Sequence, residues 1–348
     1  MSDSIIIADL QSYNKKGHSE GHYFSVAENY YDILSDDFNI IVAGGPVYQK
    51  KFKSMFLLPH DCKAEEPVFL QKLKTIINGL YLLRNVKDGA IVFQCSAVST
   101  IIGLLTIIRP KTRIFLIQYD NMISSSRLKR MLFRIAKKRI QGIICSGKEI
   151  GENLGLPYCI VPDYIYSGNK MDSSTSIKYD FGIYGILSAD KGVLEAAEFF
   201  AKTNYSLKIA GKIAGLAKDQ EMARKLENLV KTHANLDISI GYLPEAEYHD
   251  YIAATRYIVL NYSGVYMNRS SGVILDALYA GKPVLAKRRE YVEFVEENGL
   301  GILFDRIQDL NMDDLFEDEK YSTMQSNINV YLTKQKNNIK RLKNFLID

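Results

Sequence analysis

The residues best suited to holding a ligand follow an apolar run in the second half of the chain. In GILSADKG (Gly185–Gly192) a predicted strand ends at Gly185 and a helix is expected to follow. Ser188 can cap that helix, and Lys191 falls in its first turn. Free N–H groups and the dipole of a helix N-terminus attract phosphate, so a lysine there adds a compact charge for a diphosphate. A solvated lysine on an ordinary strand-to-helix loop is the equal alternative.

Further candidate ligand groups lie at three later turns. In LKIAGKIAG (Leu207–Gly215) a predicted strand is followed by a turn of small residues, which let the backbone approach a ligand closely. The next strand ends just before a Gly-Tyr-Leu turn, and a donor-rich loop later opens another helix. The candidate residues at these turns are Lys212, Gly241, Tyr242, Leu243, Arg269, Ser270, Ser271, Gly272 and Asp276.

The order of these segments carries a resemblance. GxLSxxKG, LxIxG, IGYLPxxEYxxYxxxxRYIVLxxS and SSGVxLDALxxGKPVLA together resemble the donor-binding domain of GT-B glycosyltransferases, the retaining family 4-like group, over about residues 140–305. The resemblance implies a nucleotide-diphosphate-sugar donor, with UDP or GDP most expected, and no metal or other cofactor. Lys191 aligns with the diphosphate-binding lysine, Gly241–Leu243 with the loop that cradles the base, and the helix near Ser271 with the one that faces the diphosphate.

Two positions depart from the family pattern. Ile186 stands where an arginine is usual, and Asn268 and Asp276 stand where two glutamates are usual. Asp276 can still accept a hydrogen bond from a ribose, and Asn268 can bond sugar hydroxyls without carrying charge. Arg269 or Lys212 is the expected replacement for the missing arginine.

The resemblance assigns the acceptor to the first half of the chain. In its first loop Gly17, His18, Gly21 and His22 precede an amphipathic helix and are candidates for acceptor or phosphate contacts, with exposed or capping histidines as the alternative. Later strand ends carry Gln94-Cys95-Ser96 and Gln118–Asn121. Asp120 is the only carboxylate there, a candidate base or acceptor-orienting group, with a helix cap as the competing interpretation.

The elements that must position these residues follow from periodicity. Short apolar runs predict strands, and the amphipathic segments between them predict helices. Strands buried on both faces and separated by helices indicate parallel sheets, so we expect an α/β fold of two Rossmann-like doubly wound domains facing a cleft. The expected strands are Ile5–Ala8, Phe38–Val42, Ala90–Gln94, Arg113–Ile117, Gly142–Cys145, Asp180–Tyr184, Leu207–Ala210, Leu236–Ile240, Tyr257–Leu260, Pro283–Ala286 and Gly301–Phe304.

A polar, Ser-rich interval interrupts this alternation and reads as a linker. The predicted organisation is an acceptor-binding domain at 1–165, the linker at 166–178, and a nucleotide-sugar-binding domain at 179–320. A C-terminal helix at 321–348 is expected to cross back to the first domain.

Composition excludes several classes of protein. The 348 residues are 47% hydrophobic and 24% charged with a net charge of +4, which excludes disordered, collagen-like and coiled-coil chains and gives no sign of nucleic-acid binding. The four cysteines form no CxxC pair or zinc spacing, so Cys95, Cys145 and Cys159 are expected as core residues in a reducing compartment. The uncharged stretch Ala90–Ile108 is long enough to span a membrane, but a strand followed by a helix fits better.

A basic amphipathic segment, SSSRLKRMLFRIAKKRIQ (residues 124–141), holds seven Lys/Arg and no acid. Leu128, Met131, Leu132, Ile135 and Ala136 fall on one helical face. Such a helix can lie on an anionic membrane surface. The alternative is a domain helix packed on its sheet by that same face.

These observations predict a cytoplasmic enzyme, and residues 124–141 leave open a peripheral contact with the cytoplasmic face of the membrane. We expect a hexosyltransferase-type glycosyltransferase that moves a sugar from a nucleotide-diphosphate donor to a saccharide or lipid-linked acceptor, with retention, in bacterial surface polysaccharide synthesis. The alternatives are a degenerate GT-B subunit that binds a partner without catalysis, and a GT-B nucleotide-sugar epimerase. The sequence leaves open the donor sugar, the acceptor, the linkage and the oligomeric state.

Overall fold

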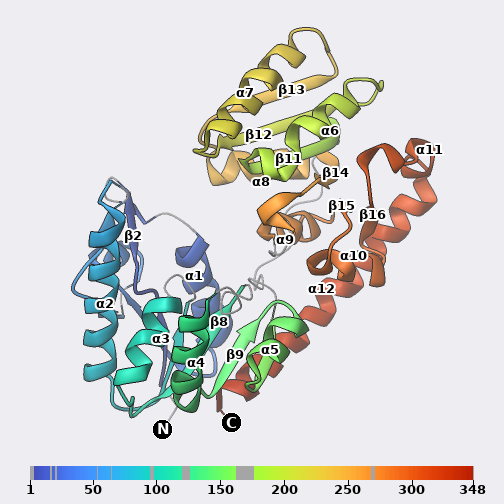
Figure 1. Ribbon diagram of the computed structural model, residues 1–348. Coiled ribbons are helices and arrows are strands. Elements are labelled where there is room, and N and C mark those ends of the chain that lie inside the picture. The colour runs from blue at the N-terminus through green and yellow to red at the C-terminus, as the bar shows by residue number, and fades with distance from the viewer. Residues whose placement is uncertain are drawn as a thin grey trace. The chain divides into compact units, whose positions relative to one another are not determined.

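The chain folds as two units, each built on its own parallel sheet (Figure 1). The computed structural model describes residues 4–15, 18–19, 22–52, 54–63, 65–94, 98–119, 126–161, 176–267 and 271–347. The first unit comprises residues 1–167 and 336–348, and the second comprises residues 168–335. Most of the expected linker at 166–178 lies outside the described residues.

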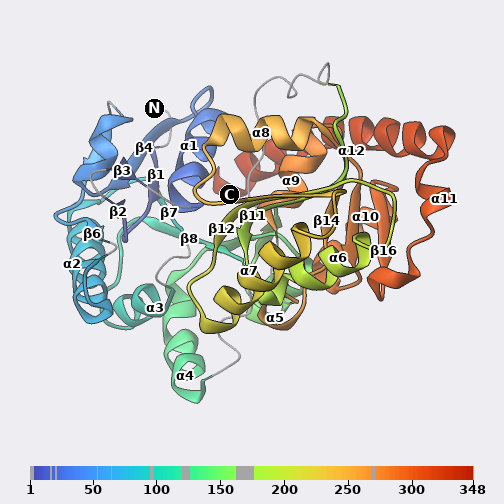
Figure 2. The same ribbon diagram turned by 90° about the horizontal axis from the view of Figure 1, so that it is seen from above.

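The first unit contains a parallel sheet in the order β10-β9-β8-β7-β1-β4-β5. Its strands read as unbroken apolar runs because helices cover both faces: α1 lies on one face, and α2, α3 and α4 lie on the other (Figures 1 and 2). The strands are β1 (Ser4–Ala8), β4 (Asn39–Gly44), β5 (Met55–Leu57), β7 (Ala90–Phe93), β8 (Arg113–Gln118), β9 (Gly142–Cys145) and β10 (Tyr158–Ile160). The helices are α1 (His22–Leu34), α2 (Val68–Asn85), α3 (Val98–Ile107), α4 (Arg127–Ala136) and α5 (Lys148–Leu154).

Alternation along the strands divides the core of this unit into two layers. On the α1 side, Ile5 and Ile7 pack with Tyr30 of α1. The end of the long helix α12 (Asp318–Ile347) completes the same layer with Leu342 and Leu346, both fully buried. The C-terminal turns of the chain are therefore part of the first unit's core. A separate small sheet of β2 (Tyr13–Lys15), β3 (His18–Ser19) and β6 (Cys62–Lys63) lies beside it, with β2 and β3 antiparallel.

The second unit contains a parallel sheet in the order β13-β12-β11-β14-β15-β16. Helices α6 and α7 lie on one face, and α8 and α9 lie on the other (Figure 2). The strands are β11 (Tyr179–Leu187), β12 (Leu207–Ile213), β13 (Leu236–Ile240), β14 (Thr255–Leu260), β15 (Val284–Lys287) and β16 (Gly301–Phe304). The helices are α6 (Val193–Phe200), α7 (Ala217–Val230), α8 (Glu245–Ala253), α9 (Gly272–Tyr279), α10 (Glu293–Glu297) and α11 (Met312–Leu315).

The predicted fold class is confirmed, since both sheets are parallel and doubly wound. The uncharged stretch Ala90–Ile108 folds as β7 and then α3, as expected. Among the described helices, none is both long and apolar enough to cross a membrane. Strands β5, β6 and β10 were not predicted, because two or three residues are too few to show a period. Cys62, Cys145 and Cys159 are buried free thiols; Cys95 lies outside the described residues.

Candidate functional site

Each of the two large parallel sheets has one point where the strand order reverses, and ligands of doubly wound folds bind outside the carboxyl ends of the strands at that point. In the second unit the reversal falls between β11 and β14, because β12 and β13 extend to one side of β11 and β15 and β16 extend beyond β14. Lys191 follows β11, and Tyr262 follows β14. The sheet topology therefore brings the predicted diphosphate-binding lysine to the expected edge.

The turn after β11 differs from the sequence prediction. Ser188 does not cap a helix: its hydroxyl donates to Asp219 Oδ1 at 3.0 Å, and the backbone N–H of Ala189 donates to the same atom at 2.8 Å. Burial alone would raise the pKa of Asp219, but these bonds and one from the backbone N–H of Leu216 hold it below its ordinary value. The residues Ala189–Lys191 form a 3₁₀ turn (η4), so Lys191 precedes α6 rather than lying in its first turn.

Gly192 lets this turn press against the end of β14. It adopts φ +62°, and a Cβ there would lie 2.1 Å from the carbonyl oxygen of Asn261. No other residue fits, because both the left-handed backbone and the contact exclude a side chain. The backbone N–H of Ser263 donates to the Asp190 carbonyl at 2.7 Å, and its hydroxyl donates to the same oxygen at 3.1 Å. The loops after β11 and β14 are thus fastened together.

This fastening places two cations on the same aromatic pair. Lys191 Nζ lies 5.2 Å from the ring centroids of both Tyr262 and Tyr266. The guanidinium carbon of Arg289 lies 5.0 Å from the Tyr262 ring, and its Nη1 donates to the Tyr266 carbonyl at 2.8 Å. Cation–π attraction at these distances holds both charges in place. A buried edge of a sheet that carries two cations can attract a dianionic diphosphate.

Arg289 was missed by the sequence analysis. It is 5% exposed, and burial lowers its pKa to about 10. The available signal was the run Lys287-Arg288-Arg289 at the end of β15, the strand next to β14. That β14 and β15 are neighbours is known only from the sheet. The sequence therefore showed the basic run but not that it lies next to Tyr262.

The other predicted donor residues that the structure describes lie near the ends of several strands and at the start of α9. Lys212 is exposed and lies in register with Ile186, which is 54% exposed. Solvent therefore surrounds the position where the sequence analysis expected a replacement for the missing arginine. Gly185, Gly241 and Tyr242 lie at the carboxyl edge of the sheet, with Tyr242 77% exposed, and Leu243 packs on the core of the α8 and α9 face. The residues Asn268, Arg269 and Ser270 lie outside the described residues.

The start of α9 adds hydroxyl groups to this edge. Ser271 precedes the first helical residue Gly272, as predicted, and its hydroxyl is 3.1 Å from the Tyr262 hydroxyl. Asp276 is 7% exposed and accepts a hydrogen bond from the Tyr248 hydroxyl at 2.5 Å. The hydroxyl of Tyr248 is thus bound to Oδ2 of Asp276, the carboxylate that the sequence analysis expected to accept a hydrogen bond from a ribose.

In the first unit, most predicted acceptor residues lie outside the description. This holds for Gly17, Gly21 and Asp120, while His18 and His22 are described only as backbone at the start of β3 and α1. The carboxylate found at the carboxyl end of β1 is Asp9, which is 1% exposed and accepts a hydrogen bond from the Tyr48 hydroxyl at 2.6 Å. Burial first, and then Asp9, raises the pKa of Tyr48 well above its ordinary value.

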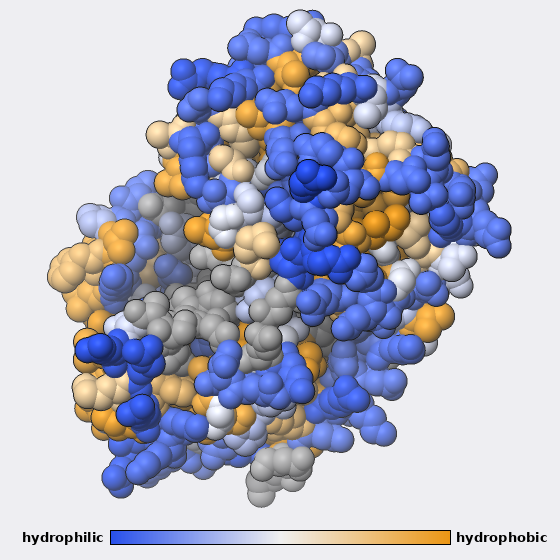
Figure 3. All heavy atoms as spheres, turned by 45° about the vertical axis from the view of Figure 1, so that its right-hand side comes forward, coloured by the Kyte–Doolittle hydropathy of each residue, from blue (hydrophilic) through white to orange (hydrophobic). Residues whose placement is uncertain are grey.

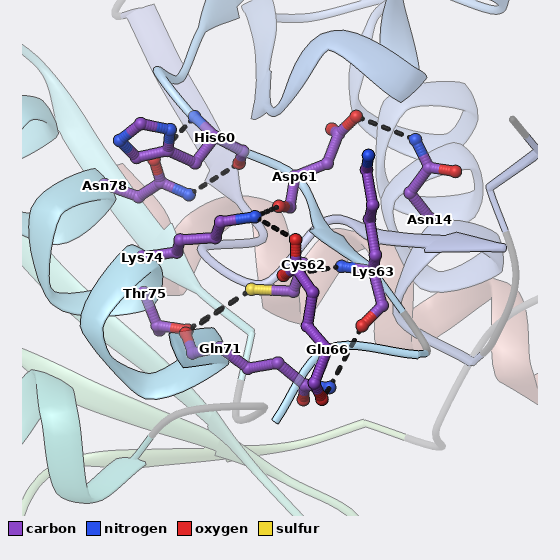
Figure 4. Close-up of polar contacts among 10 residues, drawn as sticks. All are labelled: Asn14, His60, Asp61, Cys62, Lys63, Glu66, Gln71, Lys74, Thr75 and Asn78. Atoms are coloured by element: carbon purple, nitrogen blue, oxygen red, sulfur yellow. Dashed lines mark hydrogen bonds and ion pairs between the residues drawn. The ribbon is translucent and has the colours of Figure 1, made fainter. Parts of the chain in front are cut away.

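A polar cluster beside α2 is built for structure (Figure 4). Lys74 pairs with Glu66 and donates to the Asp61 carbonyl at 3.1 Å; its hydrogen bond lowers the pKa of Glu66. Asn78, fully buried, exchanges hydrogen bonds of 2.8 and 3.1 Å with the backbone of His60. The polar groups of this cluster are therefore hydrogen-bonded to one another. Among the described residues, no group of His, Cys, Asp and Glu is arranged to hold a metal ion.

Comparison with known proteins was informative only at the level of structure. No protein-family model matches the chain, and no curated protein matches it either. The N-terminal domain of Candida albicans trehalose-6-phosphate phosphatase is similar, with TM-score 0.70, 9% identity, and coverage of 99% of this chain and 97% of that one. HepE of Anabaena, solved with UDP, gives TM-score 0.69, 13% identity and 99% coverage of both chains. The lipopolysaccharide outer core galactosyltransferase WaaB gives TM-score 0.60, 11% identity, and coverage of 98% of this chain and 99% of that one.

The chain has the GT-B fold. At these identities the likeness shows the fold alone, which hosts sites of differing chemistry. In this GT-B chain, the two cations on Tyr262 lie at the strand-order reversal of the second unit.

Proposed function

We propose that this protein is a glycosyltransferase that uses a nucleotide-diphosphate-sugar donor bound by the second unit. The observation that carries the proposal is the pair of cations, Lys191 and Arg289, held on Tyr262 at the point where the strand order reverses. The solved complexes of HepE with UDP and with UDP-glucose support a uridine donor. In this proposal Arg289 supplies the charge of the arginine that is usual in the family at the position of Ile186.

The proposed chemistry needs charge stabilisation more than a general base. As the bond between the sugar and the diphosphate breaks, negative charge grows on the departing phosphate, and fixed cations in a partly dry site stabilise it. Lys191 supplies a compact charge, while Arg289 donates to the Tyr266 carbonyl and places its guanidinium against the Tyr262 ring. We propose retention at the transferred hexose and an acceptor used in bacterial surface polysaccharide synthesis, as the resemblance implies. No metal or other cofactor is part of this proposal.

A thermal-shift panel tests the donor site. The full chain is melted with UDP, GDP, ADP, CDP and TDP, and with the matching nucleosides, each with and without a divalent metal. A ligand at a hundred times its Kd adds about 2.7 kcal/mol, a clear shift in Tm. We expect one nucleoside diphosphate to stabilise the protein without metal.

Lys191→Ala sharpens this test. It is expected to weaken binding of the nucleoside diphosphate about tenfold or more and to leave nucleoside binding unchanged, because only the former presents the charge. Lys202→Ala, at an exposed position of the same unit, is the matched control. Equal loss of both ligands would refute the role of Lys191, and no shift with any nucleotide would favour a degenerate, partner-binding subunit.

We further propose that the first unit contacts an anionic membrane surface on its cytoplasmic side. The sequence analysis offered packing on the sheet by the apolar face of α4 as the alternative, and the structure divides that face: Ala136 is buried and Leu132 is half-buried, while its other three residues are exposed. Leu128, Met131 and Ile135 are 60%, 54% and 46% exposed, whereas Phe133 and Ala136 are buried. Figure 3 shows hydrophobic residues, in orange, next to hydrophilic ones, in blue, on the molecular surface.

Helix α2, on the other side of α3 from α4, also exposes apolar side chains (Figure 1). Phe69 is 76% exposed, and Leu73 and Ile76, which follow it at helical spacing, are 42% and 38% exposed. Helices α2, α3 and α4 cover the same face of the sheet, and none of them contains Asp or Glu. Exposed apolar groups among cations without acids match the interface of an anionic bilayer.

A further inference from the structure

One buried carboxylate from a different helix holds the turn that carries Lys191. Asp219, in the first turn of α7, is fully buried. Its Oδ2 accepts from the backbone N–H of Leu216 at 3.1 Å, whereas its Oδ1 accepts from the Ser188 hydroxyl at 3.0 Å and the Ala189 backbone N–H at 2.8 Å. Capping of α7 needs only the bond to Oδ2. The two bonds to Oδ1 leave the helix and hold the turn after β11.

These bonds fix the backbone of Lys191 through one intermediate residue. The N–H of Lys191 donates to the Ser188 carbonyl at 3.0 Å, inside the turn η4. Helix α7 lies beside α6 on one face of the sheet and also contacts η4 (Figure 2). Asp219 therefore fastens the start of the turn to α7, while Asp190 and Gly192 fasten its end to the loop after β14. Lys191 thus extends from a turn that is fixed at both ends.

Asp219 holds the turn more strongly than the ion pair next to it in the chain. Lys218 Nζ lies 2.6 Å from Asp190 Oδ2, but the Lys218 side chain is 47% exposed, and water screens such a pair. The pKa of Asp219 lies below its ordinary value despite burial, so its oxygens accept as a carboxylate ion at neutral pH. Hydrogen bonds to an ionised acceptor are about twice as strong as those between neutral groups. The buried carboxylate is therefore the main connection between α7 and the turn.

We propose that Asp219 is a positioning residue for binding of the donor diphosphate. The ligand does not touch Asp219, which is fully buried; the carboxylate acts by fixing the turn from which Lys191 presents its charge. A charge that is already held in place binds a diphosphate more tightly than one on a mobile turn, because binding then carries no cost of ordering the turn. This inference rests on the proposed donor site and adds a residue that the ligand does not reach.

A double-mutant cycle tests the proposal. Calorimetry gives the Kd of a nucleoside diphosphate and of its nucleoside for the full chain as wild type, Asp219→Asn, Lys191→Ala and the double variant. The diphosphate is the one of UDP, GDP, ADP, CDP and TDP that stabilises the wild type in the thermal-shift panel.

Asp219→Asn keeps the shape of the side chain but turns one of its two acceptor oxygens into a donor. It is expected to raise the Kd of the diphosphate about threefold to tenfold and that of the nucleoside by less than about twofold. In the Lys191→Ala background it is expected to raise the Kd of the diphosphate by less than about twofold, because the residue that it positions is gone.

Asp180→Asn is the matched control. Asp180 Oδ2 likewise accepts from a backbone N–H and a hydroxyl, both of Ser206 and both at 2.8 Å, but it lies near the start of β11. Its substitution is expected to lower the Tm, as Asp219→Asn does, and to leave both Kd values unchanged. Ser188→Ala serves where Asp219→Asn does not fold, because it removes one bond to the turn and keeps the cap of α7. It is expected to raise the Kd of the diphosphate about twofold to threefold, and only while Lys191 is present.

The outcomes separate this inference from the donor site itself. If Lys191→Ala weakens diphosphate binding but Asp219→Asn and Ser188→Ala do not, the inference is overturned and the donor site stands. It is also overturned if Asp219→Asn weakens nucleoside binding equally, if it costs as much without Lys191, or if Asp180→Asn has the same effect on binding. If no nucleoside diphosphate stabilises the wild type, the proposed donor site fails and the inference fails with it.

Discussion

Lys282 offers a quantitative test of how burial acts in the second unit. It lies between α9 and β15 and is 3% exposed. Burial lowers its pKa from the ordinary lysine value of 10.5 to about 8. That difference corresponds to about 3 kcal/mol of cost for keeping the ammonium charged in the folded state. Lys282→Met removes the charge and keeps most of the side-chain volume, so the variant is expected to be more stable than the wild type at pH 7 by up to about 3 kcal/mol.

The same shift fixes the direction of the pH dependence. Below pH 8 the Lys282 amine is protonated in the folded and the unfolded chain, so the folded state bears the whole cost. Between pH 8 and 10.5 the unfolded chain binds more protons than the folded one, and the free energy of unfolding of the wild type rises with pH. The advantage of Lys282→Met is therefore expected to shrink from about 3 kcal/mol at pH 7 to about 1.4 kcal/mol at pH 9.5.

Urea unfolding at pH 7, 8, 9 and 9.5 measures this difference. Other groups titrate equally in both proteins, so the subtraction isolates the lysine. Lys202→Met, an exposed position in the same unit, is the matched control and is expected to change stability by no more than about 0.5 kcal/mol at any pH. Parallel pH curves for the wild type and Lys282→Met, or a less stable variant, would refute the reasoning.

Three further predictions follow from the site and the surface. Arg289→Met is expected to weaken nucleoside-diphosphate binding by about tenfold to a hundredfold in calorimetry, with Arg289→Lys recovering part of it; unchanged binding would contradict the pairing of the two cations. Gly192→Ala is expected to lose at least about 2 kcal/mol in urea unfolding, whereas Gly103→Ala, whose Cβ meets no atom within 4 Å, is expected to be neutral or stabilising. Leu128→Glu is expected to reduce co-sedimentation with anionic vesicles, whereas Val330→Glu, at a residue of the second unit that is 51% exposed, is not; equal effects would count against the membrane surface.

Local sequence pattern was sufficient for most of the elements. Strands β9, β13 and β16 begin and end where the apolar runs predict, at Gly142–Cys145, Leu236–Ile240 and Gly301–Phe304. Strand β9 is buried at every position, so it is a continuous apolar run, and the edge strand β13 alternates apolar and polar residues; both patterns are visible without knowing the neighbouring strands. The short strands β5 and β10 escape because so few residues carry no period.

The candidate site was predictable only in part. Lys191 could be placed from its own segment, since a residue just after a strand lies at the carboxyl edge wherever that strand sits in the sheet. Arg289 could not, because its meeting with Tyr262 depends on β14 and β15 being neighbours. Likewise the amphipathic pattern of α4 identified an apolar face but not whether the sheet or solvent meets it.

The sequence by itself determined the alternation of strands and helices, the two doubly wound units and the position of Lys191 after a strand, because each depends on residues close together in the chain. The tertiary structure alone decided which strands are neighbours and which side chains are buried. Those decisions brought Arg289 and Lys191 to the same Tyr262 ring, buried Lys282, exposed Leu128 and left the amides of Gln94 and Gln118 without partners in the described chain. Burial and strand order arise from contacts between distant segments, and no local pattern encodes them.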